Sequence, residues 1–158
     1  MNGVADGLLA TARKLAEANA RRPSQSDLRR AVSTSYYAAF HALAEVCADR
    51  LIGTSAARSD RAWLQVYRAV DHHPTAQKVR DRAHQYGFPQ TVCDFGHALY
   101  HLQQCRLDAD YNPAARYTKA DVLTLISEAD QAIRDLRATE NSDLSALAAF
   151  VLLRDRNR

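Results

Sequence analysis

Hydrophobic residues recur along most of the chain at the three- and four-residue spacing of amphipathic helices. No stretch of useful length alternates apolar and polar residues as a half-buried strand would. The pattern predicts long helices over residues 4–20, 27–51, 90–111 and 118–137. It predicts shorter helices over residues 60–70, 75–86 and, from 141 or 142, to 153. The expected fold is therefore all-α, a single helical bundle.

Turn and capping residues set the expected boundaries of these helices. Ser24 or Ser26 can cap the second helix, because a serine oxygen accepts a hydrogen bond from a free backbone N–H group there. Gly53 is a natural stop for that helix. The run His72-His73-Pro74 is expected to break the chain between two short helices, and Asn112-Pro113 to end the helix before it.

Composition supports one helical domain spanning residues 1–158, with a core of about 5–153. Hydrophobic residues make up 47% of the 158 positions, which is enough for one core. The chain contains only 5 Gly and 4 Pro, so few residues interrupt its helices. No run of 18 apolar residues predicts a membrane span, and the beginning of the sequence lacks the pattern of a secretory signal. Three scattered cysteines favour a reducing compartment, so we expect a cytoplasmic protein. The formal net charge of +3 permits contact with nucleic acid without requiring it.

The second predicted helix carries polar and aromatic residues on the face opposite its apolar stripe. At about 100° per residue, Arg30, Thr34, Tyr37 and His41 fall together on that face. One interpretation is a helix buried on both sides, with Tyr37 and His41 packed against another helix or a second subunit. The other is a ligand site, with Arg30 binding phosphate, Tyr37 stacking or hydrogen bonding, and His41 transferring a proton. The two interpretations are compatible if the site lies at a dimer interface.

The helix predicted over residues 90–111 places charge beside its apolar stripe. Arg106 projects near Leu99 and Leu102. Asp110 lies four residues further on, so the two can form an ion pair on one helix. The structural interpretation is a partly buried ion pair. The functional interpretation is a guanidinium that Asp110 orients in a cleft to bind phosphate.

Cys93, His97, His101 and Cys105 on this helix are spaced by four residues, but they do not predict a metal site. Each step of four turns about 40° around the helix, so one metal ion could reach at most two neighbours. No second pair of ligands with zinc-like spacing occurs. We therefore expect neither a metal nor another cofactor.

Two sequence motifs resemble those of the bacterial HEPN (higher eukaryote and prokaryote nucleotide-binding) superfamily. The stretch Leu28–Leu43 contains the pattern Arg-Ala-x-Ser-x-x-Tyr-Tyr-Ala-x-Phe-His, which is similar to an early helix of that superfamily. The stretch Arg106–Tyr111 resembles its second motif, an Arg followed shortly by Ala-Asp-Tyr. Together with the order of the helices, the resemblance covers roughly residues 5–153.

The resemblance implies a four-helix core with short extra helices, often assembled as a homodimer. It also implies an RNA- or nucleotide-associated protein, and in many members a metal-independent ribonuclease or a toxin paired with a nucleotidyltransferase antitoxin. Arg106, His41, Asp110 and Tyr111 are the expected catalytic residues, and Arg30 and Tyr37 the expected substrate-binding residues. The usual motif places a His a few residues after the Arg, whereas here Asp110 and Tyr111 occupy that place. The alternative is a non-catalytic module that binds nucleotide, RNA or a partner protein as an oligomer.

Overall fold

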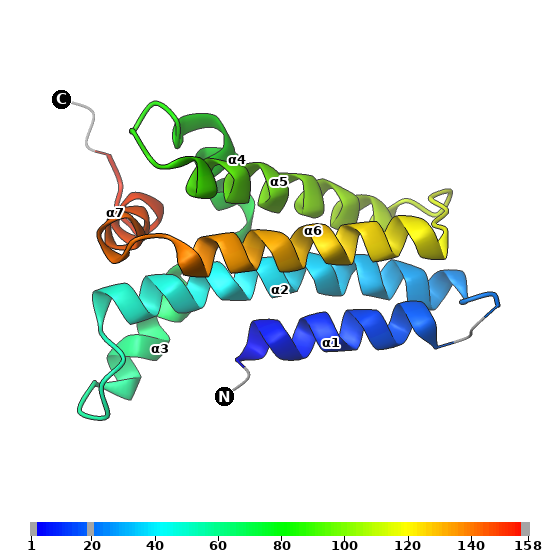
Figure 1. Cartoon of the computed structure of the whole chain (residues 1–158), viewed down its shortest axis with the longest axis horizontal. Helices are drawn as coiled ribbons and strands as arrows, with labels where there is room; N and C mark the ends of the chain where they lie inside the picture. The colour runs from blue at the N-terminus through cyan, green and yellow to red at the C-terminus, as the bar shows by residue number, and fades with distance from the viewer. Residues whose placement is uncertain (1–2, 19–20, 156–158) are drawn as a thin grey trace.

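The computed structural model describes residues 3–18 and 21–155, and within these ranges the secondary structure is entirely helical (Figure 1). The helices are α1 (Val4–Glu17), α2 (Gln25–Leu51), α3 (Asp60–Ala69), α4 (His72–Arg82), α5 (Gln90–Tyr111), α6 (Lys119–Ala138) and α7 (Asn141–Leu152). The all-α bundle predicted from the hydrophobic pattern is confirmed. No helix in the described ranges is long and apolar enough to cross a membrane.

Most helix boundaries follow the expected caps. Ser24, and not Ser26, caps α2, because its side chain accepts a hydrogen bond from the backbone N–H of Asp27. Gly53 follows α2 with a φ of +110°, a conformation that favours glycine. Thr118 and Asp121 form a reciprocal capping box at the start of α6. The predicted first helix ended at residue 20, but α1 ends at Glu17, and residues 19 and 20 lie outside the described part of the chain.

The prediction that His72-His73-Pro74 separates two helices was wrong, because these residues form the first turn of α4. The Asp71 side chain caps this helix by accepting a hydrogen bond from the backbone N–H of His73. A proline is tolerated in a first helical turn because the backbone N–H groups there have no partner within the helix. The break between α3 and α4 therefore falls at Val70 and Asp71.

Helix α2 is the centre of the bundle. It packs against α1, α3, α5, α6 and α7, and Figure 1 shows α2 and α6 crossing the middle of the molecule between α1 and α5. Its apolar stripe is buried at Leu28, Val32, Ala39 and Leu43. Small polar residues on other sides, such as Ser33 and Ser35, are also buried. Burial therefore extends almost all the way around this helix.

The end of α5 is fixed to the beginning of α2 by one guanidinium group. Arg29 donates hydrogen bonds to the backbone carbonyls of Ala109 and Asn112 at 2.9 Å, of Pro113 at 3.1 Å, and of Ala115. The last carbonyls of a helix have no partner within it, so a charged donor that serves several of them stabilises both the helix end and the loop that follows. This contact sets the position of the last turn of α5 against α2.

Replacing Arg29 with methionine should lower the free energy of unfolding by about 2–3 kcal/mol, because the carbonyls lose a charged donor. The adjacent Arg30 is exposed and is the matched control. Arg30→Met should change stability by no more than about 0.5 kcal/mol. Urea unfolding followed by circular dichroism measures both, and equal stability of the two variants would contradict the role given to Arg29.

Candidate functional site

The antiparallel packing of α2 and α5 brings together residues that are far apart in the sequence. Ser33 of α2 donates a hydrogen bond to the carboxylate of Asp110 on α5. One turn along α2, the hydroxyl of Tyr37 accepts a hydrogen bond from an Nη of Arg106 at 2.9 Å. Residues of both predicted motifs therefore meet along a single helix interface.

Arg106 is the centre of this cluster. Its side chain is 21% exposed, and its Nε lies 3.0 Å from an Asp110 carboxylate oxygen, an ion-pair distance four residues along the helix. This contact is an ion pair and not a hydrogen bond, and the buried Nε has no hydrogen-bond partner among the described residues. The guanidinium carbon also lies 5.4 Å from the ring centre of Tyr37 and 5.8 Å from that of Tyr111. Arg106 is thus held in place by an ion pair and aromatic rings while most of its donors lack partners in the described chain.

The surroundings of Arg106 favour its charged form. Burial opposes the charge, but the nearby Tyr37, Asp110 and Tyr111 more than offset this effect, so the pKa of the guanidinium is raised. A permanently charged, partly desolvated guanidinium is suited to binding a phosphate through two parallel hydrogen bonds.

His72 of α4 joins the same cluster, although its place in the sequence predicted only a break between two helices. Its ring stacks on Phe40 with centres 3.6 Å apart, and its Nδ1 lies 3.1 Å from the hydroxyl of Tyr36. It also meets the edge of the Tyr37 ring, with centres 5.8 Å apart. Both His72 and Arg106 therefore contact Tyr37. No spacing in the sequence indicated this, because His72 reaches α2 from a different helix.

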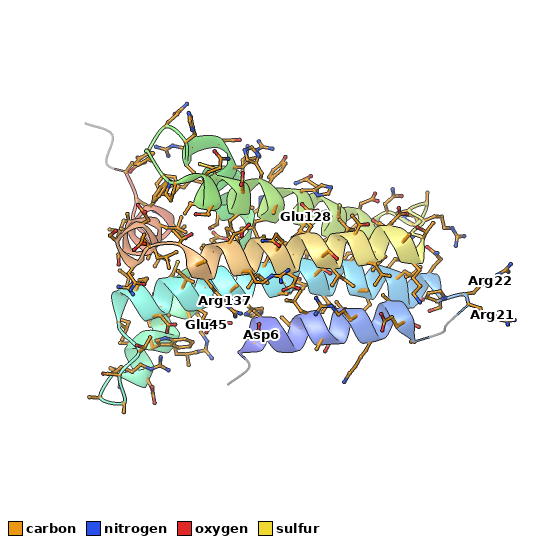
Figure 2. All side chains as sticks on the ribbon, in the orientation of Figure 1. Asp6, Arg21, Arg22, Glu45, Glu128 and Arg137 are labelled. Carbon is orange, nitrogen blue, oxygen red and sulfur yellow. The ribbon has the colours of Figure 1, made fainter. Side chains whose placement is uncertain are left out.

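A groove of about 400 Å³ lies at the end of the bundle where α2 begins and α5 ends. Arg106 does not line this groove, but it contacts Asp110 and Tyr111, which do. The walls of the groove include Arg30, Asp110 and Tyr111, three residues predicted to form the site, together with Ser26 and Arg29. Tyr111 is 71% exposed. Arg21 and Arg22 project from the same end of the bundle, as Figure 2 shows. This end of the molecule is rich in guanidinium groups and carries an exposed aromatic ring.

His41 meets this cluster only through the ring of Phe40, with centres 5.8 Å apart, and makes no hydrogen bond to Arg106 or Tyr37. Its Nδ1 is hydrogen bonded to the hydroxyl of Tyr67 on α3, and its ring stacks on that of Tyr67. It lines a separate pocket of about 530 Å³, which also contains Trp63 and Glu45. The predicted catalytic role of His41 stays a prediction, but within one chain it has no contact with Arg106.

Within residues 3–18 and 21–155, no group of three or more His, Cys, Asp or Glu side chains is arranged to hold a metal ion. His97 and His101 of the four-residue ladder are exposed on α5, whereas Cys93 is buried.

Comparison of the chain with family models, curated proteins and solved structures found no match.

The surroundings of His72 predict a pH-dependent stability. Partial desolvation of its ring, followed by the nearby Arg106 and His41, lowers the pKa of His72 below its ordinary value of 6.5, and burial also lowers the pKa of His41. Below pH 6.5 the unfolded chain therefore binds more protons at these two histidines than the folded protein does. The free energy of unfolding consequently decreases as the pH is lowered below 6.5, and it is regained as the pH is raised above that value.

Unfolding by urea at about pH 7.5 and pH 5 measures this effect. His72→Gln should reduce the difference in stability between the two pH values. His97→Gln, which removes an exposed histidine of α5, should leave that difference unchanged. An unchanged difference in the His72 variant would contradict the role given to desolvation of this ring.

Proposed function

We propose that this chain is a HEPN-type RNA-associated protein that binds a phosphate group of RNA or of a nucleotide at Arg106. The observation that carries the proposal is the partly buried Arg106 guanidinium, which Asp110 and Tyr37 orient while its Nε has no hydrogen bond to a described residue. Such a group carries a desolvation cost that a bound phosphate offsets. The two motifs that resemble the HEPN superfamily meet at this point.

The adjacent groove supports an extended ligand over an isolated phosphate. Arg30 is exposed at its wall and supplies a second positive charge. The Tyr111 ring is mostly exposed and can stack on an unpaired base, as aromatic side chains do in proteins that bind single-stranded RNA. In the proposed complex Arg106 and Arg30 each contact a phosphate, and Tyr111 contacts a base.

Metal-independent cleavage of the bound RNA is a second candidate function, favoured by the position of His72. Cleavage through the 2′-hydroxyl requires a proton acceptor, a proton donor and a cation for the charge that develops on phosphorus. Arg106 would be the cation, and His72, which shares Tyr37 with it, would transfer a proton through Nε2. His41 could take that part only if a second copy of the chain presented it across an interface.

The resemblance extends the proposal to assembly and biological context. Two copies would form a homodimer, and the protein would be the toxin of a toxin–antitoxin or defence system, paired with an antitoxin or a nucleotidyltransferase. Without cleavage, the same groove would serve a non-catalytic module that binds RNA, a nucleotide or a partner protein.

Binding is tested with a short fluorescent single-stranded RNA and fluorescence anisotropy. Arg106→Met should weaken binding about tenfold or more, because a charge-assisted contact to phosphate is lost, and Arg30→Met should weaken it less. Arg61→Met removes the same charge from the exposed surface of α3 and is the matched control. The affinity of the parent protein should fall as salt concentration rises. Equal affinity of the Arg106 and Arg61 variants would exclude the proposed site.

Cleavage is tested by incubating RNA with the protein in the presence of EDTA. If the second candidate function holds, Arg106→Met and His72→Gln should each slow cleavage about a hundredfold, since each removes one part of the chemistry. His41→Gln tests whether that residue contributes from a second subunit. Cleavage undiminished in the variants of Arg106, His72 and His41 would exclude the ribonuclease, whereas binding without cleavage would favour the non-catalytic module.

A further inference from the structure

Three side chains on the outer side of α5 and α6 form a relay that plays no part in the proposed RNA site. The Sγ of Cys105 lies 3.5 Å from Nε2 of His101, one helical turn earlier on α5. The Nδ1 of the same imidazole lies 2.9 Å from both carboxylate oxygens of Glu128 on α6. Figure 2 labels Glu128 where α6 faces α5. A thiol, an imidazole and a carboxylate are thus connected in series.

The hydrogen-bonding chemistry of this relay determines which imidazole nitrogen carries the proton. An ionised carboxylate only accepts hydrogen bonds, so Nδ1 of His101 donates to Glu128. The lone pair of Nε2 then faces the Cys105 thiol and can accept its proton. A nucleophile within hydrogen-bond reach of a base, which a third group orients, is the arrangement that activates cysteine and serine nucleophiles in enzymes.

The relay is accessible from solvent. The His101 side chain is 55% exposed and that of Glu128 29%. Cys105 is partly buried, while Cys93 is only 6% exposed and Cys47 is fully buried. The thiol of Cys93 is directed to the backbone carbonyl of Phe88, and among the described residues it makes no hydrogen bond to an imidazole. Of the three thiols, Cys105 alone combines access with a neighbouring base.

The base matters because the surroundings of Cys105 keep its thiol protonated. Burial, followed by the negative charges of Glu128 and Asp108, raises the pKa of this thiol. Attack by a thiolate present before the reaction is therefore disfavoured. A base that accepts the proton during attack removes this obstacle, and Glu128 stabilises the imidazolium that forms.

We propose that Cys105 is a nucleophilic thiol, activated by His101 and Glu128, that forms mixed disulfides with small disulfides. As Sγ attacks one sulfur of the small disulfide, His101 Nε2 accepts the thiol proton and the S–S bond of the reagent breaks. The departing sulfur takes the proton from the imidazolium and leaves as a thiol. Cys105 is oxidised to the mixed disulfide and the departing sulfur is reduced, so one disulfide is consumed and one is formed.

The folded protein is incubated with oxidised glutathione, the reaction is stopped with acid, and modification of each cysteine is followed by peptide mass spectrometry. Cys105 should react faster than Cys93 or Cys47. His101→Gln should slow its modification about tenfold or more, and Glu128→Gln should slow it by a smaller factor. His97→Gln and Glu17→Gln remove an exposed histidine and an exposed carboxylate elsewhere and should have no effect.

Alkylation by iodoacetamide gives a second measurement of the reactivity of the Cys105 thiol, and this measurement does not involve a disulfide. His101→Gln should slow alkylation of Cys105 as well, while circular dichroism verifies that the variant is folded. Modification of Cys105 at a rate within about a factor of two of the parent in the His101 variant would overturn the proposal, because no proton acceptor would then be needed. A Cys105 no more reactive than the buried Cys93 would overturn it equally.

Discussion

The burial of α2 on nearly every side determines how the other helices of the bundle pack. A helix enclosed by five others must place its polar side chains against partners within the protein, because an unpaired polar group costs free energy when it is buried. Ser33 meets Asp110, Tyr36 meets His72, Tyr37 meets Arg106, and His41 meets Tyr67. Each of these contacts joins α2 to a neighbouring helix. The polar residues of α2 therefore stabilise the packing of the bundle and also bring the residues of the candidate site together.

Arg106 is stabilised less completely than the other charged groups at this interface. Arg29, a short distance away, donates to four backbone carbonyls, and its role is structural. Arg106 has one hydrogen bond to a described residue and one ion pair. Arg106 therefore keeps N–H donors that a bound anion could accept from, and Arg29 and Arg30 add positive charge in the nearby groove. This contrast supports phosphate binding over a purely structural role for Arg106.

Helix α5 carries two kinds of chemistry on two of its faces. Cys105 and Arg106 are consecutive in the sequence, but a helical turn of about 100° directs them to different neighbours. Arg106 faces α2 and the aromatic cluster, whereas Cys105 and His101 lie beside α6 and Glu128. Modification of Cys105 would thus occur one residue from the proposed phosphate site without using any of its side chains.

The number and order of the helices followed from the sequence, because the period of apolar residues and the capping residues are local properties, although the start of α4 at His72 did not. The sequence also predicted the Arg106–Asp110 pair, which lies within one helix, and the apolar stripe at Leu99 and Leu102 on the same helix, both of which are buried. Tertiary packing alone decided which helices meet. It brought His72 to Tyr37 and Glu128 to His101, and directed His41 to Tyr67 and not to Arg106. Contacts between distant segments depend on how whole helices pack, which the spacing of residues within one helix does not encode.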